Sequence, residues 1–141
     1  MSEKNTDKVA ILVKRAALEF EKVSNPYFIK YNLTTSQYKV LKYLYAMPTR
    51  TARIVDLEHS YSMTHPTSIG LVSALEEKGF VTRIDNPEDG RGKLVALTKK
   101  ADLMQEELEA LGLTIEEEFT KSLSNKEKEE LCELLNKLLK E

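Results

Sequence analysis

The strongest structural signal in this sequence is a change of hydrophobic pattern between residues 62 and 98. Thr64 is a helix-capping residue, and His65-Pro66 fits the first turn of a helix that follows such a cap. Apolar residues then recur at helical spacing, at Leu71, Val72 and Leu75. Because glycine tolerates a positive φ, Gly79 is typical of a helix C-terminus, and we expect the helix to end there.

Two β-strands are predicted directly after this helix. Residues 80–84 and 93–98 are rich in Val, Thr, Ile and Phe, and residues 86–92 between them are dense in turn formers. Upstream, residues 51–60 suit a short helix, and residues 60–63 have the length of the turn in a helix-turn-helix. A second helix lying across a first, with a β-hairpin beside it, fits a DNA groove.

The residues in this region resemble a known family. Residues 66–83 are PTSIGLVSALEEKGFVTR, and residues 89–98 are DGRGKLVALT. These stretches resemble the MarR (multiple antibiotic resistance regulator) family of winged-helix repressors, and LTTSQYKVL at residues 33–41 extends the resemblance. The family's wing has the pattern D-x-R, five residues, then L-T, which falls here on Asp89, Arg91, Leu97 and Thr98.

The resemblance implies a fold class and a division of the chain. The expected fold is mainly α with a small β wing (α+β), a winged helix-turn-helix flanked by N- and C-terminal dimerisation helices. Residues 1–141 would form a single domain of this kind. The dimerisation helices would occupy residues 1–32 and 99–141, and the winged helix-turn-helix residues 33–98, with its wing at 85–93.

Length and composition agree with one compact protein. The chain has 141 residues, of which 41% are hydrophobic and 31% charged, as is ordinary for a soluble globular domain. No apolar run approaches the roughly 18 to 20 residues of a membrane helix, and the first residues are too polar for a secretory signal. The single cysteine, Cys132, permits no internal disulfide, which agrees with a reducing compartment. We expect a cytoplasmic protein.

The net charge of −2 is unevenly distributed. Residues 1–48 hold 8 basic and 4 acidic side chains (+4), residues 49–100 hold 8 and 7 (+1), and residues 101–141 hold 5 and 12 (−7), which sum to −2. DNA binding requires neutralisation of phosphates. The distribution places most of the acid outside the winged region, although that region is only weakly positive.

Further helices are predicted on both sides of the winged region. Apolar positions at helical spacing predict a long helix over residues 7–30, which Asn25-Pro26 should kink or split. Thr34 and Gln37 match a capping box at the start of the next helix. The buried stripe of that helix is expected at Val40, Leu41 and Leu44. Arg50, Thr51 and Arg53 open the predicted third helix, whose best core candidate is Leu57.

The C-terminal region is predicted to hold two helices. Thr98 can cap the first, in which Gly112 is a weak point, and Ser124 with Glu127 forms a capping box for the second. The apolar positions are Met104, Leu108, Leu111, Ile115 and Phe119 in the first helix, then Leu131, Leu134, Leu135 and Leu138 in the second. Together with the N-terminal helix, these faces exceed what a small winged domain can cover. A homodimer is therefore expected, as the family resemblance also implies.

The candidate DNA contacts come from the helix at 64–78, the wing and the start of the third helix. Short hydroxyls can reach phosphates or base edges, and Ile69 could meet a thymine methyl. The resemblance assigns Arg91 to the minor groove, with Asp89 holding it in place. The full set is Arg50, Arg53, Thr64, His65, Thr67, Ser68, Ile69, Ser73, Arg91 and Lys93. Gly70 departs from the family, whose members usually carry a basic or polar residue there.

An aromatic cluster at Tyr27, Phe28, Tyr31 and Tyr38 has two explanations. Core packing is the default for aromatic side chains. The resemblance supplies the alternative, a cleft for a small aromatic or phenolic anion that would release a repressor from a pseudo-palindromic operator on double-stranded DNA.

Other functions find little support in the sequence. There is no phosphate-binding glycine loop or nucleophile elbow, so we expect no enzyme and no cofactor. His59, His65 and Cys132 do not form a convincing metal-ligand set, and Cys132 is expected to be a half-buried structural thiol. The alternative to a DNA-binding regulator is a winged-helix protein-protein interaction module with weak or lost DNA binding.

Overall fold

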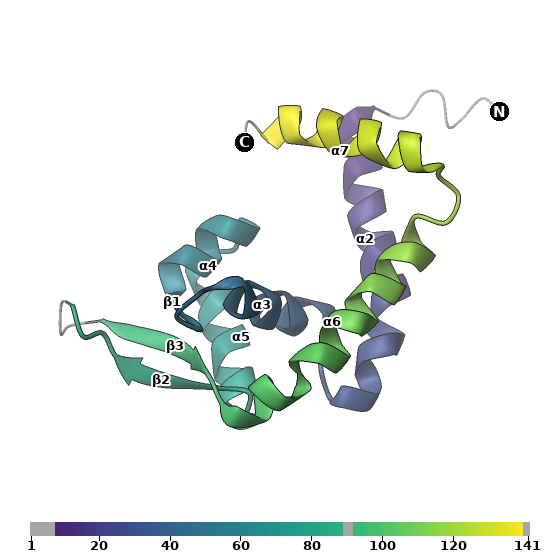
Figure 1. Cartoon of the computed structure of the whole chain (residues 1–141). Helices are drawn as coiled ribbons and strands as arrows, with labels where there is room; N and C mark the ends of the chain where they lie inside the picture. The colour runs from purple at the N-terminus through teal and green to yellow at the C-terminus, as the bar shows by residue number, and fades with distance from the viewer. Residues whose placement is uncertain (1–7, 89–91, 140–141) are drawn as a thin grey trace. The chain divides into compact units, whose positions relative to one another are not determined.

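The computed structural model describes residues 8–88 and 92–139, which form helices and one small sheet (Figure 1). In chain order the elements are α2 (Val9–Phe28), a 3₁₀ turn (Ile29–Tyr31), α3 (Thr35–Ala46), β1 (Thr51–Arg53), α4 (Ile54–Tyr61), α5 (His65–Glu77), β2 (Val81–Asp85), β3 (Lys93–Leu97), α6 (Lys99–Phe119) and α7 (Asn125–Leu139). No helix among these residues is long and apolar enough to cross a membrane. The expected class, mainly α with a small β wing, is confirmed.

The chain divides into two compact units. One consists of Met1–Tyr27 with Leu111–Glu141, and the other of Phe28–Ala110. The second unit contains the complete helix-turn-helix and the sheet. α2 belongs to the first unit except for its last residue, Phe28. α6 is divided, because its residues up to Ala110 belong to the second unit and those from Leu111 belong to the first.

The first unit is built from long helices with much apolar surface exposed. Phe20 and Phe119 pack edge to face, with ring centroids 5.1 Å apart, and Ile115 is buried. Gly112 does not interrupt α6, and Ser124 and Glu127 form the expected reciprocal cap of α7. Large side chains nevertheless remain exposed on α2, the end of α6 and α7: Val9, Ile11, Leu12, Val13, Leu18, Leu113, Leu131, Leu134, Leu138 and Leu139.

Asn25-Pro26 was predicted to kink or split the first helix, and the structure shows that it does not split it. α2 continues through Pro26 to Phe28, and the 3₁₀ turn follows. Proline removes one backbone donor, but Pro26 lies so near the helix end that few bonds depend on it. Phe28 holds that end, because its ring is buried and stacks on Tyr38 with centroids 4.6 Å apart.

The core of the second unit lies where α3, α4, α5 and the sheet meet. The predicted stripe of α3 is buried, and Leu57 is fully buried on α4. α5 contributes Val72 and Leu75 to this core, and the sheet contributes Val95. The periodic pattern therefore identified the buried faces of these three helices correctly.

The sheet has a strand that the sequence prediction missed. Its order is β1-β3-β2, with both pairs antiparallel. Thr51 to Arg53 pair with β3, so the predicted helix at 51–60 begins only at Ile54. Three residues are too few for an alternating pattern to be recognised. In Figure 1, β2 and β3 extend beyond the helices of this unit as a two-stranded projection.

The C-terminal end of α5 is held from two directions. Gly79 takes a φ of +83° as expected, and Thr98 donates to the Gly79 carbonyl at 2.6 Å while capping α6. Lys78 Nζ donates to the Asn32 carbonyl at 2.6 Å and to Gln37 Oε1 at 2.8 Å. Gln37 belongs to the capping box with Thr34, which is confirmed. The last turn of α5 is thus bonded to the segments that enter and leave the winged unit.

Candidate nucleic-acid interface

The N-terminal half of α5 presents polar groups to solvent. Thr64 caps the helix by accepting from the Thr67 N–H, and its hydroxyl donates to Thr67 Oγ1 at 3.0 Å. Both threonines are exposed, and Ile69 is half-buried. The connection from α4 runs through Ser62, whose left-handed φ of 52° lets Met63 and Thr64 lead into α5. This is the geometry of a helix-turn-helix.

Ser68 does not belong to this exposed face, contrary to the prediction. Its side chain is only 1% exposed, and its hydroxyl donates to the Thr64 carbonyl at 3.1 Å. Ser68 lies four residues before Val72, which is fully buried, so both face the core. A direct contact between the Ser68 hydroxyl and a base is therefore excluded in this conformation.

His65 and Ser73 are exposed but already bonded within the unit. His65 Nδ1 lies 2.6 Å from Glu58 Oε2, which ties the first turn of α5 to α4. Ser73 Oγ accepts from Arg83 at 3.0 Å, and the same guanidinium forms an ion pair with Glu76 at 3.3 Å. Arg83, which was not among the predicted contacts, therefore links β2 to α5.

The two arginines predicted to open the third helix occupy different positions. Arg50 has a left-handed φ of 61° before β1, and its guanidinium donates to the Tyr45 carbonyl at 3.4 Å and lies over the Tyr45 ring. Arg53 ends β1 and caps α4. Its backbone N–H and side chain both donate to Asp56, at 3.0 to 3.3 Å. These bonds hold the pKa of the Asp56 carboxyl below its usual range.

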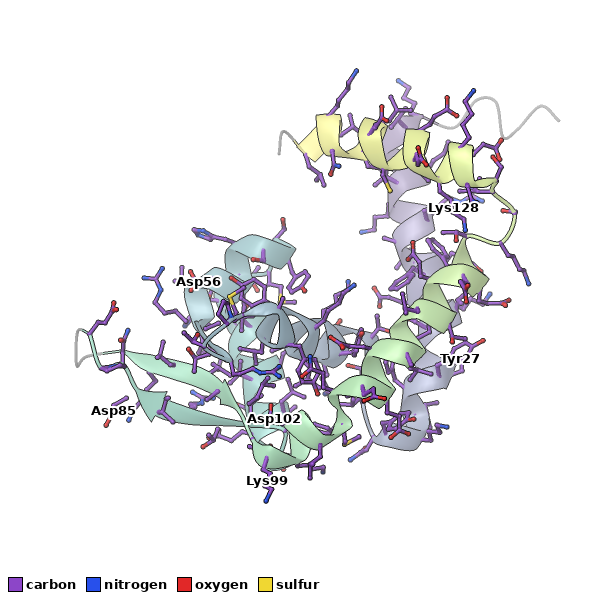
Figure 2. All side chains as sticks on the ribbon, viewed as in Figure 1. Tyr27, Asp56, Asp85, Lys99, Asp102 and Lys128 are labelled. Carbon is purple, nitrogen blue, oxygen red and sulfur yellow. The ribbon has the colours of Figure 1, made fainter. Side chains whose placement is uncertain are left out.

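The base of the wing carries an exposed ion pair. Lys93 and Asp85 face each other across β2 and β3, with Nζ 2.5 Å from Oδ1. Figure 2 shows Asp85 on the hairpin and Asp56 on α4. The hydrogen bond from Lys93 holds the pKa of Asp85 below its usual range. The predicted wing residues Asp89 and Arg91 lie outside the described residues.

The predicted aromatic cluster is divided between core and surface. Phe28 and Tyr38 are buried and stacked, which agrees with the default explanation of core packing, and burial raises the pKa of Tyr38. Tyr27 and Tyr31 are partly exposed. The Tyr31 hydroxyl donates to Glu107, and this bond raises the pKa of Tyr31. Of these four side chains, Tyr27 and Tyr31 are the two with surface that a ligand could reach.

Cys132 is exposed rather than half-buried as predicted. α7 buries none of its residues within the chain, so Leu131 and Leu135 do not cover the thiol. Among the described residues, no group of three or more His, Cys, Asp or Glu side chains is arranged to hold a metal ion.

The fold and the exposed polar face of α5 together define a winged helix-turn-helix protein. A family model described as MarR family matches residues 33–93. The HTH-type transcriptional regulator YwoH of Bacillus subtilis is 30% identical over 129 residues, which cover 92% of this chain and 92% of YwoH. The chain belongs to the MarR family of transcriptional regulators.

Solved structures show the same fold. A mutant of MarR from E. coli, in complex with operator DNA, is 29% identical, and the match covers 93% of each chain with a TM-score of 0.83. BpsR of Bordetella bronchiseptica, whose DNA binding is regulated by 6-hydroxynicotinic acid, is 22% identical, with 94% of each chain covered and a TM-score of 0.84. At that identity BpsR shares the fold alone.

Proposed function

We propose that this chain is a cytoplasmic, sequence-specific regulator that binds double-stranded DNA and acts as a repressor. The observation that carries the proposal is the exposed N-terminal half of α5, with Thr64 and Thr67 directed to solvent in a complete winged helix-turn-helix. A relative that is 29% identical is known in complex with operator DNA. In such folds the second helix enters the major groove by its N-terminal residues.

The hydroxyl pair at the start of α5 is suited to DNA. Thr67 Oγ1 accepts from Thr64, so the Thr67 hydroxyl can donate its own proton to a phosphate oxygen or a base acceptor. The helix N-terminus adds partial positive charge at the same place. Ile69, beside them, offers an apolar contact to a thymine methyl.

The basic residues of the winged helix-turn-helix contribute less to DNA binding than their number suggests. Arg53, Arg83 and Lys93 each form an ion pair with a carboxylate of the same unit, and α5 itself contains no lysine or arginine. A phosphate must therefore compete with Asp56, Glu76 or Asp85 for these cations. We propose that Arg91 in the wing adds a minor-groove contact, as the family resemblance implies.

The exposed apolar residues of the first unit support a homodimer. Leu134, Leu138 and Leu139 on α7 and Val9 and Ile11 on α2 are more than half exposed. Apolar surface of this extent marks a protein-protein interface. A two-fold dimer would place two α5 helices on the half-sites of a pseudo-palindromic operator.

Selection from a random-sequence DNA pool tests the function. The full-length protein should enrich duplexes with two related half-sites about one helical turn apart, and should bind them at least about a thousand-fold more tightly than random duplexes. Failure to enrich any sequence would favour the second candidate, a protein-protein interaction module. The ion pairs that occupy Arg53, Arg83 and Lys93 are the observation in favour of that candidate.

We further propose that a small aromatic anion releases the repressor, by contacts that include the exposed parts of Tyr27 and Tyr31. BpsR, with the same fold, is regulated by 6-hydroxynicotinic acid. A ligand shifts an equilibrium only through differential affinity, so ligand and operator must weaken each other's binding equally. Salicylate titrations with and without the selected duplex measure this coupling, and equal affinities in both would contradict it.

A further inference from the structure

Gly70 lies in the middle of α5 without any structural reason to be glycine. Its φ is not positive, unlike that of Gly79, and it lies well inside the helix. A Cβ atom built at Gly70 would meet nothing within 4 Å. Neither backbone conformation nor internal packing therefore requires the absence of a side chain.

The glycine is also unfavourable for the helix itself. Glycine in a helix interior destabilises the helix relative to alanine. Glycine loses more conformational freedom than alanine on folding, and it leaves the helix backbone more exposed to water. Since an alanine would fit and would stabilise α5, the folded chain alone does not account for glycine here. Something that approaches the exposed face of α5 from outside would account for it.

The neighbours of Gly70 show what that face presents. Thr67 and Ser73 lie three residues before and after it, which places them on the same side of the helix. Both are exposed, as Gly70 is. Glycine thus leaves a gap between two hydroxyl-bearing residues, where the helix backbone itself is the surface. A gap of this kind is found where a partner must come close to the backbone.

We propose that Gly70 is a specificity-determining residue: its missing side chain lets the edge of a base pair in the major groove contact the α5 backbone directly. The proposal rests on the proposed function. A base edge, rather than a phosphate, is the occupant because the backbone N–H groups at the middle of a helix are already bonded within it and cannot bind an anion. Contact at Gly70 is therefore by shape, and its contribution is to sequence preference rather than to charge.

The test is a size series at Gly70, measured for stability and for binding. Gly70→Ala and Gly70→Leu should raise the melting temperature by about 2 to 6 °C, because both residues favour helix. Each should weaken binding to the duplex selected by the wild-type protein, Ala by about 10-fold and Leu by more. Affinity for a random duplex and the salt dependence should not change, since no charge is altered.

A matched control separates stabilisation from contact. Asn136→Ala is a neutral substitution that also raises helix propensity, at an exposed position of α7 outside the winged unit. Asn136 lies two residues from both Leu134 and Leu138, which places it on the opposite side of α7 from these proposed dimer contacts. It should raise the melting temperature and leave operator affinity unchanged. If Gly70→Ala binds the selected duplex as tightly as the wild type, the inference is wrong although the proposed function stands. If the wild-type protein selects no duplex, it is the proposed function that fails.

Discussion

At the scale of single residues, burial decides which of two neighbouring hydroxyl side chains can contact DNA. Thr67 and Ser68 are neighbours, yet Thr67 is exposed and Ser68 is 1% exposed. Ser68 lies four residues before Val72, and Val72 lies three residues before Leu75. This helical spacing already indicated that Ser68 faces the buried side of the helix. The bonds that occupy Arg50 and Arg53 were not predictable, because they depend on a left-handed turn and a short strand that leave little trace in the sequence.

The ion pair at the base of the wing leads to a prediction about affinity. Asp85→Asn should release Lys93 for a phosphate contact and remove a carboxylate that repels DNA. Binding to selected and random duplexes should tighten by a similar factor. The salt slope should steepen by about one unit for each wing that gains a contact. Binding isotherms over a salt series measure both quantities.

Asp102→Asn is the matched control for this variant. It changes the net charge equally, but its carboxylate stands at the start of α6 (Figure 2) rather than beside Lys93. Identical salt slopes for the two variants would show that Lys93 does not contact phosphate.

At the scale of elements, helix boundaries with a cap in the sequence were predicted well, and those without one were not. The caps at Thr34, Thr64, Thr98 and Ser124 all have their expected partners. Each cap is a local interaction within a few residues, so the sequence alone identifies it. β1 was missed because its existence depends on pairing with β3, more than forty residues later in the chain.

The cap that joins β1 to α4 should give α4 a pH-dependent stability. The pKa of Asp56 is lowered in the folded protein, chiefly by the hydrogen bond from Arg53. Its contribution is therefore present above the unfolded pKa of about 3.9 and is lost as the pH falls through the lower folded pKa. Asp56→Ala should reduce the free energy of unfolding by about 0.5 to 1 kcal/mol at pH 7 and pH 5, and by less at pH 3.

Urea unfolding of the wild-type protein and of Asp56→Ala at each pH, at one fixed protein concentration, measures this difference in the free energy of unfolding. A difference that already narrows between pH 7 and pH 5 would assign the effect to another titrating group.

At the scale of the whole molecule, the sequence predicted a surplus of apolar surface, and the structure shows where it is exposed. α7 buries none of its residues within the chain, although five of its fifteen residues are leucines. The same pattern predicted a partner subunit that would cover them. The proposed aromatic ligand followed from the family resemblance, and the burial of Phe28 and Tyr38 removes half of its predicted contacts.

Removal of α7 should therefore disturb the oligomeric state. A chain that ends before Ser124 loses the exposed leucines at 131, 134, 138 and 139, which we propose lie in the dimer interface, and leaves the exposed apolar residues of α2 without that part of the interface. We expect a monomer or aggregates, as measured by light scattering. A truncated protein that remains a well-behaved dimer would place the interface elsewhere.

The bonds at the end of α5 separate the part of this helix that anchors from the part that is exposed. Lys78 and Gly79, after the last turn, are held by Asn32, Gln37 and Thr98, whereas the exposed candidate DNA contacts Thr64, His65 and Thr67 lie at the start of the helix. Exchange of an exposed residue there removes none of these anchors. Mutational drift can therefore give the protein new target sequences while the fold persists, and a duplicated copy could acquire different target genes by few substitutions.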